Sequence, residues 1–466
     1  MIKQLIIIIF LGGCCLPGFA QNKGAKLVSN QNPPNIVILL ADDLGYGDIG
    51  CFGNTKILTP HLDELAQKGL LLSDCYSSAP MCSPSRAGLL TGRIPNKTGV
   101  YDWIAPDSIH HLKADELTIA ELLKQAGYQT SHHGKWHLNG NMDGSQPLPS
   151  DHGFEYYFTT QYSAHHLSPS GFYRNGKKLY QQHGYSCDVV VKDALKYLHQ
   201  RDKGKPFFQY IAFHETHEPV AAPPEYLEQY CSAGKKAIYY GCVSNLDKAI
   251  GRYIKQLEKM GLAENTIIIF TSDNGPATWN KGYFARSYGS AGDLKGRKRF
   301  LFEGGIRVPG IIYWPDHIKA AKSTTPVCNI DFLPTICELA NVKLPTGKSI
   351  DGVSIVPLLK GKNLQREKPL HWHFYAPMDG PNSVMRVDDW ILSARWDGGE
   401  YSRGRFRAEY VNDMKSAQLT DFKLYNIVKD IHQDNDVSSQ YPDLFNELKS
   451  QLIELHQEVK EDSPLW

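Results

Sequence analysis

Three short, mostly apolar runs recur along the chain, and each ends abruptly in polar residues. Residues 36–41 read IVILLA and lead into two aspartates, residues 207–213 read FFQYIAF and lead into HETHEP, and residues 267–270 read IIIF and lead into TSDNG. Short runs rich in Ile, Val and Phe are typical of strands buried on both faces, as in a parallel sheet covered by helices. We therefore predict three buried parallel strands, each ending in polar side chains.

Segments with apolar residues at helical spacing lie between and after these runs. They include LTIAELLKQAGY at 117–128 and CDVVVKDALKYLHQ at 187–200, while VCNIDFLPTICELANV at 327–342 is expected to be either another helix or a strand followed by a helix. Strands that alternate with helices favour an α/β domain with a mostly parallel sheet. The expected fold is a large mixed, mostly parallel sheet sandwiched by helices, within a main domain at 35–361.

The last quarter of the chain has a different pattern. The polar stretch KNLQREKP at 362–369 is a plausible linker. Short alternating segments follow, such as LHWHFYAP, SVMRVDDWILSARW and FKLYNIVKD, and the chain closes with the helical pattern YPDLFNELKSQLIELHQEVKE. This pattern predicts a smaller C-terminal α+β domain at 362–466, built on a short antiparallel sheet.

The N-terminus has the pattern of a secretory leader. A lysine precedes the apolar run 5–11, and small residues end at Ala20, so residues 1–20 are interpreted as a signal peptide and 21–34 as a polar segment. The apolar run is too short to span a bilayer. We expect export to the periplasm or secretion; the alternative is cleavage at LGGC and lipid anchoring through Cys14.

Charge and cysteine content narrow the function classes. The net charge is +1, without a clustered basic excess, which argues against nucleic-acid binding. Eight of the ten cysteines lie beyond the leader, scattered singly without a C-x-x-C pair, so a zinc cluster is not expected and most should be buried small residues. One sequence does not reveal disulfide pairing or oligomeric state.

The polar ends of the three predicted strands are candidates for a common site. In a doubly wound sheet, ligands bind beyond the carboxyl ends of the strands. Each segment alone could be an ordinary turn, since Asp, Asn and Gly are common turn formers. The coincidence of three buried strands that each deliver carboxylates, amides or imidazoles favours a site over three unrelated turns.

The segment MCSPSRAGLLTG at 81–92 carries the signals of a short helix. Cys82 or Ser83 is expected at the N-cap, Pro84 in the first turn and Gly92 at the stop. A helix N-terminus attracts anions, and an arginine four residues after the cysteine lies on the same helical face. On these facts Cys82 could be a buried structural thiol or a thiolate nucleophile, which would need a base nearby.

The same segment resembles the signature of the type I sulfatases. Cys82, Pro84, Ser85 and Arg86, followed by LTGR at 90–93, are similar to that family's C-x-P-S-R and L-T-G-R motifs. The resemblance implies an alkaline-phosphatase-like fold. It also implies that a maturation enzyme oxidises Cys82 to formylglycine (3-oxoalanine), whose hydrated aldehyde supplies the nucleophilic oxygen.

Other segments resemble further parts of the family pattern. ILLADDLGYGD and FTSDNG are similar to its two metal-binding segments, which places Asp42, Asp43, Asp273 and Asn274 on a divalent cation, with the modified residue 82 as a further ligand. An all-oxygen ligand set suits a hard ion, Ca²⁺ by preference with Mg²⁺ as the alternative.

The resemblance also assigns the groups around the sulfate. It carries over Lys135 and His137 from GKWHLNG, His217 from HETHEP and Lys298 from LKGRKRFLFEGGIRVPG, with Lys295 where the family often has arginine. Three departures are visible, because Asn139, Arg297 and Arg299 stand where the family usually has glycine.

These residue types suit hydrolysis of a sulfate ester. Positive charge from the cation, Arg86, Lys135 and Lys298 offsets the anionic sulfur centre and the charge that develops on the leaving oxygen. We expect His217 to protonate the leaving sugar oxygen. His137 is expected to deprotonate the second hydroxyl of the diol, so that the aldehyde reforms and sulfate leaves.

The substrate is predicted by resemblance alone. The chain resembles carbohydrate sulfatases of the N-acetylgalactosamine-6-sulfatase type, which implies a galactose-type or N-acetylhexosamine unit of a glycan. Two alternatives stay open: a phosphonate or phosphodiester hydrolase of the same superfamily, and a catalytically silent glycan-binding relative. Candidates for the leaving-group pocket, each also an ordinary loop or core residue, are Asp102, Trp103, His165, His166, His371, Trp372 and His373.

Overall fold

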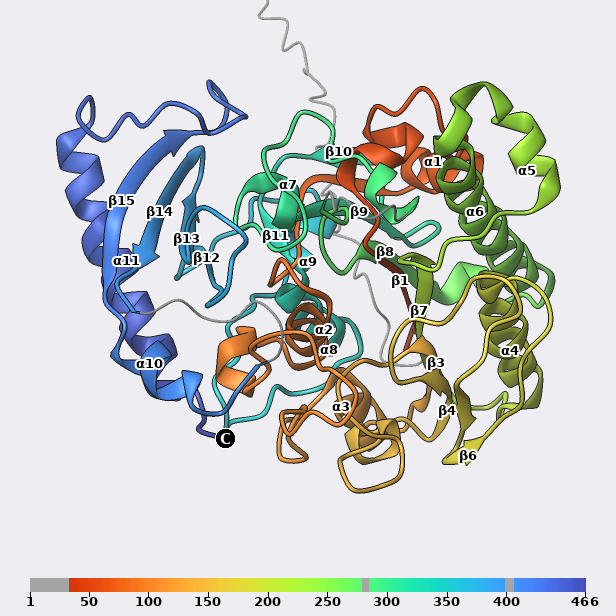
Figure 1. The fold of residues 1–466 in the computed structure, drawn as a ribbon. Helices are drawn as coiled ribbons and strands as arrows, with labels where there is room; N and C mark the ends of the chain where they lie inside the picture. The colour runs from red at the N-terminus through yellow and green to blue at the C-terminus, as the bar shows by residue number, and fades with distance from the viewer. Residues whose placement is uncertain (1–32, 279–284, 399–405) are drawn as a thin grey trace, which may run out of the picture.

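The computed structural model describes residues 33–278, 285–398 and 406–466 (Figure 1). The predicted signal peptide, Cys14 and nearly all of the polar segment 21–34 therefore lie outside the described residues. Within the described ranges, none of the helices combines the length and apolar character needed to cross a bilayer. All eight cysteines from Cys51 to Cys337 are free thiols.

The main body is built on an eleven-stranded mixed sheet. Its order is β10-β2-β9-β8-β1-β7-β3-β4-β5-β6, with β11 paired to β2. The five central neighbours β8, β1, β7, β3 and β4 are mutually parallel, whereas β9, β5 and β6 run antiparallel to their neighbours. The strands are β1 Asn35–Asp42, β2 Leu70–Tyr76, β3 Gln129–Lys135, β4 Tyr156–Thr160, β5 Phe172–Arg174, β6 Lys177–Lys178, β7 Phe207–Thr216, β8 Thr266–Ser272, β9 Arg307–Tyr313, β10 Ala321–Ser323 and β11 Val327–Cys328.

Strand β1 lies at the centre of this sheet, between the two other predicted strands. Its register pairs Ile36 with Phe208 of β7 and with Ile267 of β8. Every residue of β1 is buried, and alternate side chains enter two separate cores, Ile36 on one face and Val37 on the other. The continuous apolar run is thus explained by burial on both faces.

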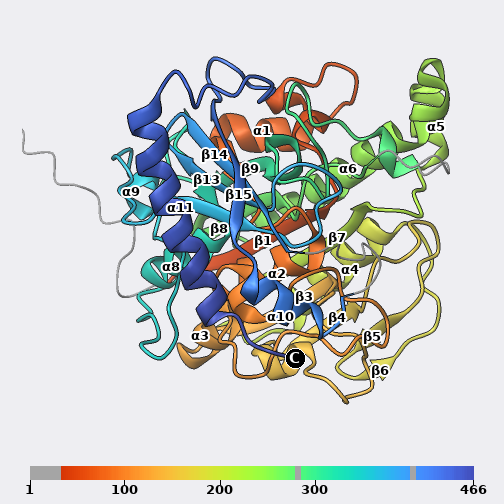
Figure 2. The same cartoon turned by 60° about the vertical axis from the view of Figure 1, so that its left-hand side comes forward.

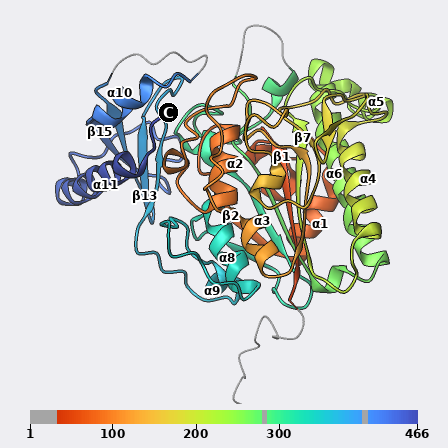
Figure 3. The same cartoon turned by 90° about the horizontal axis from the view of Figure 1, so that it is seen from below.

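Helices cover both faces of the sheet (Figure 3). One face packs against α2 Cys82–Thr91, α3 Ile119–Gln125, α8 Phe332–Leu339 and α9 Val356–Leu359. The other packs against α1 Pro60–Lys68, α4 Ser186–Gln200 and α6 Ala237–Lys259, with α5 Pro224–Gln229 beside α6. The predicted sandwich is confirmed, and 327–342 is a strand, β11, followed by helix α8.

A second, antiparallel sheet follows the main body. Its order is β12-β13-β14-β15, with β12 Leu370–His373, β13 Ser383–Val387, β14 Trp390–Trp396 and β15 Leu419–Asn426. The long helix α11 Pro442–Asp462 lies across it, and the short helices α7 Glu303–Ile306 and α10 Tyr410–Ser416 complete the fold (Figure 2). This confirms the predicted α+β character of the C-terminal part; the residue boundaries of the two domains stay a prediction.

The antiparallel sheet has two buried faces with different partners. Leu392 and Leu424 face α11, where they pack against Leu452. The opposite face carries Trp372, which shares a core cluster with Cys82 at the start of α2. The C-terminal sheet therefore forms one wall around the segment that carries the sequence signature.

Candidate active site

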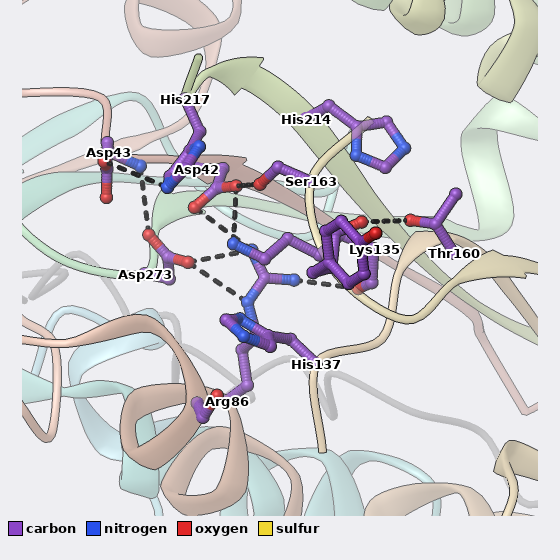
Figure 4. A network of polar contacts seen from close by, with 12 residues as sticks. Asp42, Asp43, Arg86, Lys135, His137, Thr160, Ser163, His214, His217 and Asp273 are labelled. Carbon is purple, nitrogen blue, oxygen red and sulfur yellow. Dashed lines mark hydrogen bonds and ion pairs between the residues drawn. The ribbon is translucent and has the colours of Figure 1, made fainter. Parts of the chain in front are cut away.

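The carboxyl ends of β1 and β8 bring four predicted ligands together. Ala41 pairs with Ser272 in the parallel register, so the residues that follow each of them leave the sheet side by side. Asp42, Asp43 and Asp273 each offer an oxygen within 4.8 Å of the others, and all three are buried (Figure 4). This confirms the expectation that separate strand ends meet.

The same cluster contains buried oxygens that make no hydrogen bond. They are Oδ1 of Asp42, Oδ2 of Asp43 and Oδ1 of Asn274. Buried polar atoms normally have a hydrogen-bond partner. Three buried oxygens without a hydrogen bond in one cluster therefore indicate that a group that accepts their lone pairs belongs there. A hard divalent cation has that chemistry, and the residues present fit one.

Basic side chains surround the carboxylates. The Nζ atom of Lys135, at the end of β3, donates to Oδ2 of Asp42 at 2.7 Å, and that of Lys298 donates to Oδ1 of Asp43 at 2.6 Å. Burial opposes the charge of Asp42, but Lys135 and other neighbouring cations hold its pKa well below the usual range. For Asp273, burial and the charge of Asp42 raise the pKa to about 6.

Cys82 is the first residue of helix α2. The N-cap is Met81, one residue earlier than predicted, and Gly92 ends the helix in the left-handed conformation as expected. The thiol is buried, and burial raises its pKa although Lys135 and Lys298 act to lower it. A raised pKa disfavours the thiolate, which weakens the interpretation of Cys82 as a thiolate nucleophile.

Arg86 is fully buried beneath this site. Its Nε and Nη2 atoms donate to Oδ2 of Asp273 at 3.1 and 2.8 Å, and Nη1 donates to the carbonyl of Lys135 at 2.9 Å. The guanidinium therefore donates its hydrogen bonds to Asp273, a predicted cation ligand, and to the backbone of Lys135, rather than to position 82. It still places a fixed positive charge under the cluster.

His137 presents an unpaired ring nitrogen. Its Nε2 lies 3.1 Å from the carbonyl oxygen of Ile104, while Nδ1 is buried without a partner. A carbonyl only accepts, so Nε2 carries the proton and Nδ1 the lone pair. Burial, with Lys135 and Arg86 nearby, lowers the pKa of His137 well below its usual value. The ring is thus neutral, with a free lone pair at Nδ1.

His217 lies at the opposite side of the cluster, after β7. Nδ1 contacts the carbonyl oxygen of Glu218 at 2.9 Å, and Nε2 accepts a hydrogen bond from Arg286 at 2.9 Å. Nε2 is also 3.9 Å from Oδ2 of Asp43. Burial lowers the pKa of His217 to about 3, although the nearby aspartates act to raise it.

Two residues of this site were not predicted from the sequence. Ser163 donates to Oδ2 of Asp42 at 2.6 Å, and Arg286 contacts His217. Ser163 comes from the loop after β4 and Arg286 from the short 3-10 helix Ala285–Tyr288, and neither stands in a pattern that signals chemistry. His214 lies in β7, three residues before His217. Its ring accepts a hydrogen bond from the backbone N–H of Ala164 and lies beside the cluster (Figure 4).

The predicted pocket residues Asp102 and Trp103 lie near the site. Asp102 is fully buried and accepts hydrogen bonds from its neighbour's backbone and from the hydroxyl of Tyr375. Trp103 is half-buried and packs against the cluster that contains Cys82. Asp102 is therefore fully buried beside Trp103, which stays partly exposed.

The other predicted pocket residues are more dispersed. His165 is exposed, and its Nδ1 accepts from the backbone of Leu167. His166 is fully buried and contacts the carbonyl of His214 and the thiol of Cys242. The structure does not bring His165 into the cluster, and it packs His166 behind it.

His371 and His373 lie on the other face of strand β12 from Trp372, because successive side chains in a strand alternate. Their rings contact each other at 2.9 Å, and His373 also lies 3.3 Å from His456 of α11. Trp372 points toward α2 and donates to the carbonyl of Ser77. The two histidines therefore belong to the contact with α11 and are separated from Cys82 by the sheet.

Comparison with known proteins decides the family. The Sulfatase family model matches residues 34–342, about two thirds of the chain, and the model described as N-sulphoglucosamine sulphohydrolase, C-terminal, matches residues 296–394. The chain belongs to the sulfatase family. It is 33% identical to human arylsulfatase A over 371 residues, which cover 73% of this chain and 70% of that protein. It is also 33% identical to human N-acetylgalactosamine-6-sulfatase over 363 residues, covering 72% and 67%.

Solved structures agree with this membership. This sulfatase superposes on the crystal structure of Ps i-CgsB with a TM-score of 0.77 and 28% identity, covering 93% of this chain and 94% of that one. The phosphonate monoester hydrolase of Agrobacterium radiobacter, with a TM-score of 0.62 and 18% identity, shares the fold alone. The predicted family, the fold class and the enzyme class of sulfuric ester hydrolase are confirmed.

Proposed function

We propose that this sulfatase removes sulfate from a sulfated carbohydrate, using formylglycine made from Cys82 and a divalent cation. The observation that supports this proposal is the group of buried oxygens without hydrogen bonds on Asp42, Asp43 and Asn274. These oxygens lie among the basic residues that act to lower the pKa of Cys82. Formylglycine supplies a nucleophilic oxygen, and the cation supplies positive charge at the sulfate. Side chains of this protein are assigned the remaining tasks, which are sulfate binding and proton transfer.

Lys135 and Lys298 bind the sulfate oxygens. Each ammonium group rests on one carboxylate of the cation site, Lys135 on Asp42 and Lys298 on Asp43. When a cation neutralises those carboxylates, the lysines can turn their donors to an anion. Arg86 stays in place and fixes Asp273, whose carboxylate it grips with two donors.

His137 and His217 each transfer a proton, His137 at residue 82 and His217 at the leaving group. His137 accepts a proton at its unpaired Nδ1 as sulfate leaves residue 82. His217 lies by the leaving-group oxygen and protonates it. A guanidinium has donors only, so Nε2 of His217 holds no proton while Arg286 donates to it. His217 can act as the acid only after Arg286 has moved away and the ring has taken up a proton from solvent.

The cation is proposed to be Ca²⁺, with Mg²⁺ as the alternative. The ligand set consists of carboxylate and amide oxygens, from Asp42, Asp43, Asp273 and Asn274, and residue 82 adds a further oxygen. A crowded set of oxygens suits the larger ion, because Mg²⁺ demands a near-ideal octahedron and usually retains water.

The substrate class follows from the relatives. N-acetylgalactosamine-6-sulfatase carries a sulfated amino sugar in its name, and Ps i-CgsB has also been crystallised with k-i-k-neocarrahexaose. These names support a galactose-type or N-acetylhexosamine unit for this enzyme. Trp103 offers an aromatic face for the sugar. The proposed partners are the glycan and a formylglycine-generating enzyme, and the proposed location is the periplasm or the exterior.

The test is a screen of the matured enzyme on sulfated mono- and oligosaccharides of defined sulfate position. Mass spectrometry of the residue-82 peptide should show a loss of about 18 mass units, as thiol becomes aldehyde. Cys82→Ala should abolish sulfate release while leaving the fold intact. Faster turnover of an aryl phosphodiester than of the aryl sulfate would contradict the proposal, and so would full activity of Cys82→Ala.

A further inference from the structure

Arg286 lies at the edge of the candidate active site, and the scheme above assigns it no contact with the substrate. Its Nη1 atom is 2.9 Å from Nε2 of His217 and 3.9 Å from Oδ2 of Asp43, and its Nη2 atom is 3.1 Å from Oε1 of Glu218. The side chain is 23% exposed. It thus joins the buried cluster to the solvent.

Arg286 sits on the leaving-group side of the site. Lys298 and Asn274 occupy Oδ1 of Asp43, whereas Arg286 and His217 face Oδ2 of the same carboxylate. In an in-line displacement the leaving oxygen departs opposite the nucleophile, and the proposed function assigns that oxygen to His217. The guanidinium therefore lies beside the departing sugar rather than over the sulfate under attack.

The local chemistry suits recognition of an anion. Arginine presents a planar fork of donors that matches carboxylate and sulfate groups. Glu218 shows this match within the protein, because its carboxylate already faces Nη2. Its side chain is 21% exposed, so a ligand that enters from solvent can compete with it. Movement of Arg286 toward such a ligand would also free Nε2 of His217.

We infer that Arg286 is a specificity-determining residue that binds a second anionic group of the glycan, a sulfate or a uronate carboxylate, next to the sulfate that is removed. The inference rests on the proposed function, since it assigns the leaving-group side through His217. It makes this enzyme selective for glycans with two neighbouring anionic groups.

The experiment measures binding in a Cys82→Ala background, so that turnover is not needed. Calorimetry compares one disaccharide that carries a single sulfate with two versions that carry a second group, either sulfate or carboxylate. With Arg286 present, at least one doubly anionic ligand should bind about 10- to 100-fold more tightly, the range of one charge-assisted hydrogen-bonded pair. The arm with the larger preference identifies the group.

Arg286→Gln is the decisive variant, because glutamine keeps an N–H donor for His217 but removes the charge. It should abolish the preference and change binding of the singly sulfated ligand less than about threefold. Arg252→Gln, which removes an arginine paired with Asp188 on the surface, should preserve the preference.

Three results would overturn the inference. These are equal affinity for all ligands with Arg286 present, an equal loss for all ligands in Arg286→Gln, and no measurable binding of any ligand. Equal loss would mean that Arg286 acts through His217 alone. Failure of the proposed function gives a different result, namely no sulfate release by the matured wild-type enzyme, and it leaves the binding comparison interpretable.

Discussion

The ammonium group of Lys298 lies 2.6 Å from Oδ1 of Asp43, so a proposed sulfate-binding lysine shares a carboxylate with the proposed cation site. Lys298 is almost completely buried. Burial acts to lower its pKa, but Asp43 together with Cys82 and Asp42 raises the pKa above its usual value. The lysine therefore stays charged throughout the neutral range. The proposed function therefore predicts that cation binding and sulfate binding are coupled through this pair.

Lys298 and Lys295 make a matched test of this assignment. Lys295 lies in the same loop, but its ammonium group pairs with Asp434 at the surface and with the carbonyl of Gln433. Lys298→Gln should lower kcat/KM for a sulfate ester by about 10²- to 10³-fold, as expected when a donor to the developing charge is lost. Lys295→Gln should stay within about threefold of wild type. Steady-state kinetics decide, and a larger loss in Lys295→Gln would reverse the assignment.

Removal of the cation should affect stability as well as activity. Without it, Asp42, Asp43 and Asn274 each keep a buried oxygen that accepts no hydrogen bond. A ligand that binds only the folded state raises the melting temperature with its concentration. Chelated enzyme should therefore melt at a lower temperature and lose activity, and Ca²⁺ should restore both more effectively than Mg²⁺ at equal concentration. A chelated enzyme with unchanged melting temperature and activity would contradict a cation site here.

Lys97 joins the main body to helix α11. Its buried ammonium group lies 2.8 Å from Asp351, 2.9 Å from Glu458 and 3.3 Å from Asp462. Lys97→Ala leaves those carboxylates without their shared partner and should lower the free energy of unfolding by about 3 kcal/mol.

The control for Lys97 is Lys68→Ala. Lys68 forms an exposed pair with Glu64 one helical turn away, and such pairs contribute less than about 1 kcal/mol. Denaturant unfolding of both variants measures the contrast. Similar losses in the two variants would show that Lys97 does not hold the two parts together.

The sequence predicted the strand ends better than the surrounding loops. Asp42 and Asp273 directly follow long buried runs, so their place beside each other follows from parallel pairing. Ser163 lies in a loop and Arg286 in a single-turn 3-10 helix. The positions of both segments depend on packing between parts of the chain that are distant in sequence, which the local sequence pattern does not reveal. The histidines of β12 illustrate the converse. His371 and His373 were predicted near the sugar, but strand alternation turns them to the far face, because Trp372 between them fills the core beside Cys82.

The buried histidines between β12 and α11 predict that the stability of the fold depends on pH. Burial lowers the pKa of His371 to about 3 and that of His456 to about 4, and it places the pKa of His373, which lies between them, well below its usual value. The folded state therefore keeps these rings neutral, while the unfolded chain takes up protons as the pH falls below about 6.5. Stability from these rings is complete above that pH and is lost progressively below it, toward the folded pKa values.

His456→Gln isolates this effect from opposing ones. Buried Asp48 and Asp247 have pKa values raised to about 7 by burial, so they favour the folded state at lower pH and mask the slope of the whole protein. At about pH 5.5, one histidine that must stay neutral costs about 1.4 kcal/mol. Between pH 7.5 and 5.5, roughly that much more stability should be lost by wild type than by His456→Gln. His183→Gln, which changes an exposed histidine, should follow wild type. Parallel stability curves for wild type and His456→Gln would show that the ring of His456, next to His373, does not resist protonation. The contact with α11 would then not make the C-terminal sheet beside Cys82 sensitive to acid.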